Sequence, residues 1–165
     1  MPNTRNNPTT PLARKVAIIG SACRFPGGST TPQAFFDSLL GGRNYVRPVP
    51  ADRWSNDTYL NEQDVCGKTY VGHGHFLEEY DFRGFDADFF NFSPREAEFL
   101  DPQQRLLLEL SFEAMENAGL CVEALAGSQT GVFVGGFTVD HLLNQFGSHA
   151  RGMIGAHSAA GSTLT

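Results

Sequence analysis

The alternation of apolar and polar positions is most regular between Ser93 and Gly119, where it predicts two consecutive helices. Ser93 is followed by a proline, and Glu96 stands three residues after the serine, which is the spacing of a capped helix start. Pro102 would deprive a continuing helix of a backbone hydrogen-bond donor, so we expect the chain to break there and to restart with Asp101 as the cap. The second helix should end at Gly119.

Apolar side chains cover most of the second predicted helix. At steps of three and four residues one face carries Leu107, Leu110, Ala114 and Ala118. The apolar surface is widened by Leu106, Leu108, Phe112 and Met115. A helix with so broad an apolar surface must be buried on more than one side. The remaining narrow strip is charged, as a face in water or a ridge that faces a partner would be, and we favour the face in water. It consists of Arg105, Glu109, Glu113 and Glu116.

Two short apolar runs that end in glycine, Val16–Gly20 and Gly131–Gly135, predict strands that are covered on both faces in a parallel sheet. Between them we expect a helix from about Pro32 to Leu40 and an extended stretch near Lys68–Phe76. This order of strands and helices is typical of an α/β protein. A last short helix is predicted from Phe137 to Phe146, with Thr138 as its cap and a buried side of Val139, Leu142, Leu143 and Phe146.

The composition describes a packed, mildly acidic protein of 165 residues with 41% hydrophobic residues and a formal net charge of −6. No cluster of Lys and Arg is present, so we exclude nucleic acid as a partner. No apolar segment is long enough to span a bilayer or to act as a signal peptide, so we expect no membrane insertion and a cytoplasmic location. Residues 1–13, rich in Asn, Thr and Pro, are expected to be a flexible leader.

The sequence contains three widely spaced cysteines, Cys23, Cys66 and Cys121. We predict that they are reduced. Cys23 precedes Arg24 in the turn after the first predicted strand, and a neighbouring cation can lower the pKa of a thiol. It is therefore the least implausible nucleophile, but we interpret it as a packed small residue.

The histidines do not predict a metal site. His73 and His75 would point to the same side of a strand, and Glu78 and Glu79 could supplement them, but two imidazoles do not make a site. Three other histidines recur every eight residues through a glycine-rich region without forming one helical face, and we interpret the spacing of His141, His149 and His157 as coincidence.

Two features invite a phosphate-binding interpretation, and neither supports it. Arg43, Arg47 and Arg53 lie in one proline-containing loop and could meet a phosphate-bearing arm, but scattered loop arginines are more often solvated charges. The glycine-rich turn after the first predicted strand matches no nucleotide-binding pattern, and Pro26 removes a backbone donor that a phosphate cradle would need.

Four blocks in order, VAIIGSACRFPGG, VPADRW, FDADFFNFSPREAEFLDPQQRLLLE and TGVFVG, closely resemble the β-ketoacyl synthase (ketosynthase) domains of type I polyketide synthases. The resemblance implies a partial thiolase-like fold, the incomplete N-terminal half of a ketosynthase, over residues 14–165. The departures are few: Asn91 stands where glycine is common, and Ser111 and Phe112 replace a more usual small-plus-aromatic pair. The resemblance also places Phe137 and His141 near a dimer interface and substrate entrance, although core packing is favoured for both.

The chemistry that the resemblance implies is decarboxylative Claisen condensation. A cysteine in a DTACSSS-like block accepts an acyl chain from the phosphopantetheine arm of an acyl carrier protein, and two histidines assist decarboxylation of a malonyl thioester. No such block occurs in this sequence, and Ala156–Thr165 resembles the helix that leads towards it. We therefore assign no catalytic, cofactor-binding or metal-binding residue. The implied partners are the acyl carrier protein, the remaining ketosynthase and acyltransferase regions, and a second copy in a parent homodimer.

Three hypotheses follow. The first is a ketosynthase fragment truncated before the nucleophile and inactive alone. The second is a non-catalytic truncated module that binds a full-length synthase or an acyl carrier protein. The third is a self-sufficient acyltransferase that uses Cys23. An unfinished sheet would leave strand edges and apolar helix faces in water, so we also expect the chain alone to be poorly soluble.

Overall fold

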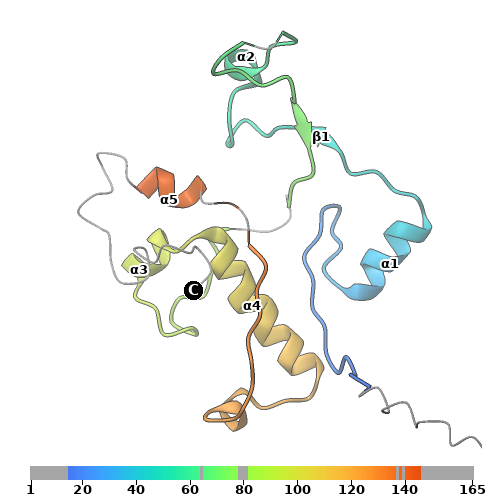
Figure 1. Ribbon diagram of the computed structural model, residues 1–165, viewed down its shortest axis with the longest axis vertical. Coiled ribbons are helices and arrows are strands. Elements are labelled where there is room, and N and C mark those ends of the chain that lie inside the picture. Colours follow the sequence, from blue (N-terminus) through green and yellow to red (C-terminus); the bar gives the residue numbers. More distant parts are fainter. Residues whose placement is uncertain (1–14, 64, 78–81, 137, 139, 146–165) are drawn as a thin grey trace, which may run out of the picture.

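The computed structural model describes residues 15–63, 65–77, 82–136, 138 and 140–145 (Figure 1). Its elements are α1 (Pro32–Leu40), β1 (Arg47–Pro48), α2 (Asn56–Tyr59), β2 (His73–Gly74), α3 (Pro94–Phe99), α4 (Pro102–Asn117), the 3-10 helix Val122–Leu125 and α5 (Asp140–Gln145). The longest helix, α4, is central in Figure 1, with α1 on one side, α3 and α5 on the other, and a lobe of β1, α2 and β2 beyond its N-terminal end.

The two capped helices are confirmed. The Ser93 hydroxyl accepts a hydrogen bond from the Glu96 backbone N–H, and the Glu96 carboxylate accepts one from the Ser93 N–H at 2.9 Å. The Asp101 carboxylate accepts from the backbone N–H of Gln103 at 2.8 Å and begins α4. The helix ends at Asn117, and Gly119 follows with a φ of 68°, a left-handed conformation that glycine adopts without strain.

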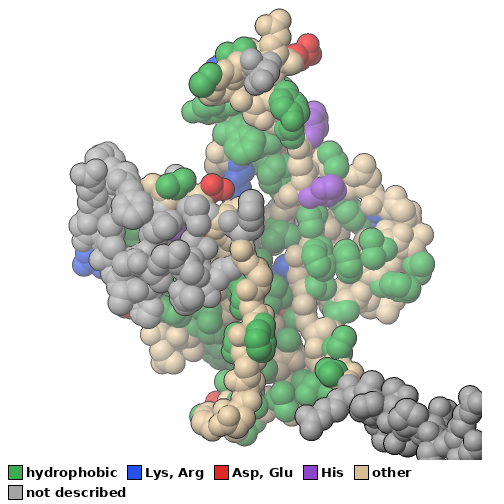
Figure 2. Space-filling model, viewed as in Figure 1, with side chains coloured by type: hydrophobic (Ala, Val, Ile, Leu, Met, Phe, Trp, Pro, Cys, Tyr) green, Lys and Arg blue, Asp and Glu red, His purple; other side chains and the backbone are tan. Residues whose placement is uncertain are grey.

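Helix α1 is also confirmed, and a buried polar cluster joins it to the preceding turn. Ser29 is only 1% exposed, its hydroxyl lies 3.2 Å from that of Ser38, and the Ser38 hydroxyl lies 3.0 Å from that of Tyr45. The Phe25 and Phe35 rings stack with centroids 4.2 Å apart. One side of the helix stays in water, and Figure 2 shows hydrophobic side chains gathered over α1, where the exposed residues are Phe36, Leu39 and Leu40.

The expected extended stretch at Lys68–Phe76 is a strand over two residues only, His73–Gly74. These pair antiparallel with Arg47–Pro48, and the ladder continues loosely through a hydrogen bond from the Val49 N–H to the Gly72 carbonyl at 3.0 Å. Val49 is buried at this junction. The pairing is short because a proline cannot donate to a ladder.

The prediction of two buried strands is wrong. Neither Val16–Gly20 nor Gly131–Gly135 is a strand, and both are exposed: Val16 is 93% and Phe133 97% accessible to solvent. A strand exists only through hydrogen bonds to a neighbouring strand, and the described residues place no such neighbour beside either run. The described residues therefore combine helices with extended segments, and the apolar side chains of the two runs lie in water.

The predicted helix at 137–146 is confirmed in its central part as α5. Phe137, Val139 and Phe146 lie outside the described residues, as do the side chain of Leu142 and the predicted leader at 1–13. Leu143 was predicted to be buried and is instead 63% exposed. No apolar surface covers it within the described part of the chain, because α5 contacts the corner between α3 and α4 through polar groups.

Candidate functional site

Helix α4 holds the turn at residues 20–30 through several contacts along its length. A side chain at Gly20 would place its Cβ 2.2 Å from the Ala114 carbonyl oxygen, so only glycine allows this approach. One residue on, the Ser21 N–H donates to Oδ1 of Asn117 at 3.1 Å. The turn and the helix therefore form one unit.

An ion pair completes the attachment of this turn. The Arg24 guanidinium holds the Glu113 carboxylate through both terminal nitrogens, one of them at 2.8 Å, and donates to the Cys23 carbonyl at 3.1 Å. Such bidentate, charge-assisted pairs are stronger than single hydrogen bonds and have a more specific geometry. Sequence reasoning missed this pair, since its members are 89 residues apart.

The prediction for the charged strip of α4 is therefore also wrong in part. We expected all four residues to face water, but Glu113 pairs with Arg24, and Arg105 donates to the Phe82 carbonyl at 2.6 Å. Arg105 and Glu113 are half-buried, whereas Glu116 is exposed as expected. The apolar side is half-buried along most of its length, with no residue of α4 fully buried.

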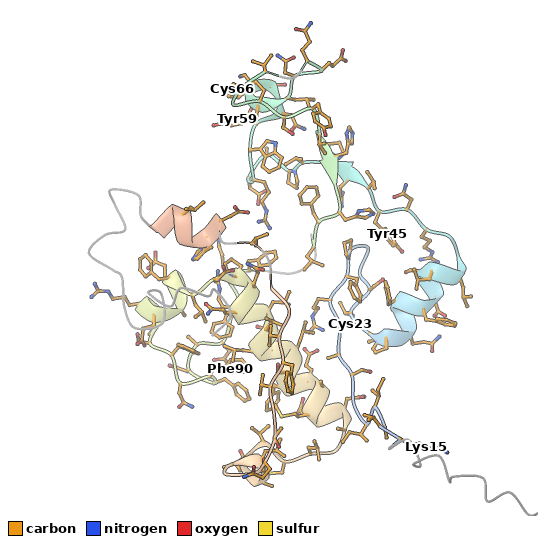
Figure 3. The ribbon with its side chains drawn as sticks, viewed as in Figure 1. Lys15, Cys23, Tyr45, Tyr59, Cys66 and Phe90 are labelled. Atoms are coloured by element: carbon orange, nitrogen blue, oxygen red, sulfur yellow. The ribbon has the colours of Figure 1, made fainter. Side chains whose placement is uncertain are left out.

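Cys23 lies in the turn beside α4, in an environment that does not suit a nucleophile (Figure 3). Its thiol is half-buried and donates to the Ser29 carbonyl, with Sγ 3.8 Å from the oxygen. Burial raises the pKa of the Cys23 thiol, Arg24 opposes this effect and Glu113 adds to it. A raised pKa reduces the fraction of the reactive thiolate at neutral pH.

The other two thiols are exposed and belong to other parts of the chain. Cys66 lies in the lobe that carries α2 (Figure 3), and Cys121 precedes the 3-10 helix. The Cys121 thiol donates to Oε2 of Glu123 at 2.8 Å, and this hydrogen bond lowers the pKa of the Glu123 carboxyl. None of the three cysteines forms a disulfide.

The described histidines differ in their exposure to solvent. His73 and His75 are exposed on and beside β2, while Glu78, Glu79, His149 and His157 lie outside the described residues. In the part of the chain that is described, no three side chains of His, Cys, Asp or Glu converge as a metal site would require. His141 is half-buried, and its Nε2 donates to the Phe99 carbonyl at 3.1 Å, so it joins α5 to the end of α3.

Of the three loop arginines, Arg53 is exposed but contacts an aromatic ring. The Arg53 guanidinium carbon lies 5.2 Å from the centroid of the Phe82 ring, within the range of a cation–π interaction. Arg43 and Arg47 are exposed, and Arg47 is in β1. The interpretation as a solvated charge is thus too simple for Arg53, which links the loop to the segment before α3.

A cavity of about 650 Å³ that sequence reasoning missed lies between the turn at 83–88 and the helices α3 and α4. Its lining is largely charged and includes Arg83, Asp86, Asp88, Glu98 and Arg105. The aromatic residues of this turn pack beside it: the Phe85 and Phe90 rings stack at 5.1 Å, and Phe89 meets Phe112 of α4 edge-on at 4.8 Å. The only signal in the sequence was the alternation of Phe and Asp before Ser93.

Asn91, the departure at a position where glycine is common, is explained by its backbone. It has a φ of 59°, the only non-glycine residue of the described chain in the left-handed region. Asparagine adopts that region more readily than other residues with a side chain, so the replacement keeps the turn before α3.

Comparison with known proteins settles the family. Residues 13–162 match the model of the β-ketoacyl synthase N-terminal domain. The chain belongs to the β-ketoacyl synthase family. It is 45% identical over 133 residues to a phenolphthiocerol/phthiocerol polyketide synthase of Mycobacterium tuberculosis, and 51% identical over 122 residues to the polyketide synthase GfsB of Streptomyces halstedii. These matches cover 80% and 73% of this ketosynthase chain but only 6% and 2% of the two synthases.

A solved structure extends the likeness to the fold. The oxazolomycin ketosynthase domain OzmH KS7 from Streptomyces albus matches with a TM-score of 0.72 and 35% identity, over 82% of this chain and 24% of that one. The predicted partial thiolase-like fold is therefore confirmed, since the chain corresponds to part of a ketosynthase domain. None of the described helices is both long and apolar enough to cross a bilayer.

Proposed function

We propose that this ketosynthase chain forms the N-terminal scaffold of a domain that joins acyl and malonyl thioesters by decarboxylative Claisen condensation, and that the chain alone is inactive. The observation that carries the proposal is the family match across residues 13–162. The environment of Cys23 supports the proposed inactivity of the isolated chain. Burial raises the pKa of this thiol, Glu113 adds to the effect, and a thiol with a raised pKa is a poor nucleophile at neutral pH.

In this proposal the chain positions other groups rather than reacting. The acyl groups would arrive on the phosphopantetheine arm of an acyl carrier protein, and the nucleophilic cysteine and both histidines would come from the remaining ketosynthase regions. A partner acyltransferase region and a parent homodimer belong to the same proposal. We further propose a cytoplasmic location, with which the three free thiols agree.

The decisive chemical experiment is incubation of the purified chain with an acyl thioester of N-acetylcysteamine, followed by intact-mass spectrometry. We expect no acyl adduct on Cys23 in the native chain. Iodoacetamide provides the matched control, because it should modify the exposed Cys66 and Cys121 under the same conditions. An acyl adduct that disappears in Cys23→Ser would instead establish the self-sufficient acyltransferase.

A second experiment separates the enzyme fragment from the non-catalytic binding module. The encoding DNA is read in frame past Thr165, where we expect a DTACSSS-like block within a couple of dozen codons. A stop codon directly after Thr165, together with retention of the chain on an immobilised acyl carrier protein, would favour the binding module. Exposed runs such as Val16–Gly20 and Gly131–Gly135 suit assembly with further chain in either case.

A further inference from the structure

Helix α5 contacts the body of the protein through two polar side chains near its start. Nε2 of His141 donates to the Phe99 carbonyl at 3.1 Å, and Nε2 of Gln103 donates to the Thr138 hydroxyl at 3.0 Å. Phe99 is the last residue of α3, and Gln103 lies in the first turn of α4. Both contacts therefore meet the corner between these two helices, beside which Figure 1 draws α5.

The corner is well packed, whereas the described part of α5 is not. Leu100 and Asp101 are buried at the corner. In α5 the side chains of Asp140 and Leu143 are exposed, and His141 is half-buried. A helix of six residues is not stable by itself in water. Among the described side chains, two hydrogen bonds hold α5 at this corner, and each contributes only modestly to stability.

We propose that Thr138 and His141 form a two-point latch that docks α5 on the α3–α4 corner, and that α5 opens from this corner as a unit while α3 and α4 stay folded. The inference concerns contacts within the chain and does not rest on the proposed function. It gives His141 the role of a positioning residue rather than that of a ligand or core residue.

The hydrogen bonds at the corner explain why opening leaves the helices intact. The Phe99 carbonyl is one of the terminal carbonyls of α3, which no backbone N–H of the helix itself satisfies, so water can replace the imidazole there. Gln103 also donates to both oxygens of the Asp101 carboxylate at 3.3 Å, and this contact remains when Thr138 leaves. The backbone bond that caps α4, from the Gln103 N–H to Asp101, does not involve α5.

Amide hydrogen exchange of the complete chain, read by mass spectrometry, tests the latch. Thr138→Val removes the hydroxyl at nearly constant shape, and His141→Ala removes the imidazole. Each change should speed exchange in the peptide at 138–145 about five-fold, and the pair together about 25-fold, as expected for two independent hydrogen bonds. The peptide at 102–117, which covers α4, should exchange at the native rate.

Conservative variants keep the test independent of misfolding. Thr138→Ser retains a hydroxyl and His141→Gln a donor, so both should stay near native exchange. His75→Ala, an exposed imidazole outside the latch, is the matched control. Unchanged exchange at 138–145 in the double variant would overturn the proposal, and so would loss of protection in α4 together with α5. Failure of Thr138→Ser to preserve protection would assign Thr138 to packing and overturn the latch as well.

Discussion

The close approach of Gly20 to α4 leads to a sharp prediction for Gly20→Ala. The added Cβ would lie 2.2 Å from the Ala114 carbonyl oxygen and 2.7 Å from the Ala118 Cβ. Ordinary contact needs about 3.5 Å, so the turn and the helix must separate by about 1 Å. Two of the three closest atoms belong to the backbone of α4 and its C-terminal cap and cannot swing away as a long side chain would.

The magnitude follows from the contacts that this separation disturbs. Overpacking of this kind costs about 1–3 kcal/mol. The hydrogen bond from the Ser21 N–H to Asn117, one residue away, adds about 1 kcal/mol if it is lost. We therefore expect Gly20→Ala to lower the free energy of unfolding of this unit by about 3 kcal/mol, a large fraction of the stability of an ordinary domain.

Urea denaturation followed by circular dichroism of the helices measures this change. Gly135→Ala is the matched control, because no atom lies within 4 Å of the position where its Cβ would be, and its φ is not in the left-handed region. The reasoning is refuted if both variants unfold at the same urea concentration. Hydrogen exchange of α4 supplies a second readout, in which Gly20→Ala alone should reduce protection.

Three further predictions concern other contacts. Arg24→Gln should destabilise the chain by about 1 kcal/mol in thermal unfolding, because it removes the charged partner of Glu113, whose side chain is 37% exposed and so partly solvated. A loss within experimental error would show that water replaces the guanidinium fully. Asn91→Gly should leave the unfolding midpoint near native, whereas Asn91→Val should lower the stability by about 1–2 kcal/mol, because a β-branched residue resists a φ of 59°. Equal midpoints for the two variants would contradict a strained turn. Phe133→Thr should increase the soluble yield of the isolated chain, measured after high-speed centrifugation, because the ring is 97% exposed, and an unchanged yield would mean that this run does not cause association.

The helix starts could be predicted from the sequence because their causes are local. Ser93 with Glu96, and Asp101 with Pro102, cap helices through contacts within three residues, whatever the rest of the chain does. The family, too, could be inferred from ordered blocks of residues, and the family match confirmed it.

What only the tertiary structure decided depends on residues that are distant along the chain. The pairing of Arg24 with Glu113 spans 89 positions, and the contact of His141 with Phe99 spans 42, so no local pattern could reveal either. The same reason explains the wrong prediction for Val16–Gly20 and Gly131–Gly135. Apolarity in the sequence expresses a tendency to be buried, but a strand needs the hydrogen bonds of a neighbour, and only the fold determines whether that neighbour is in place.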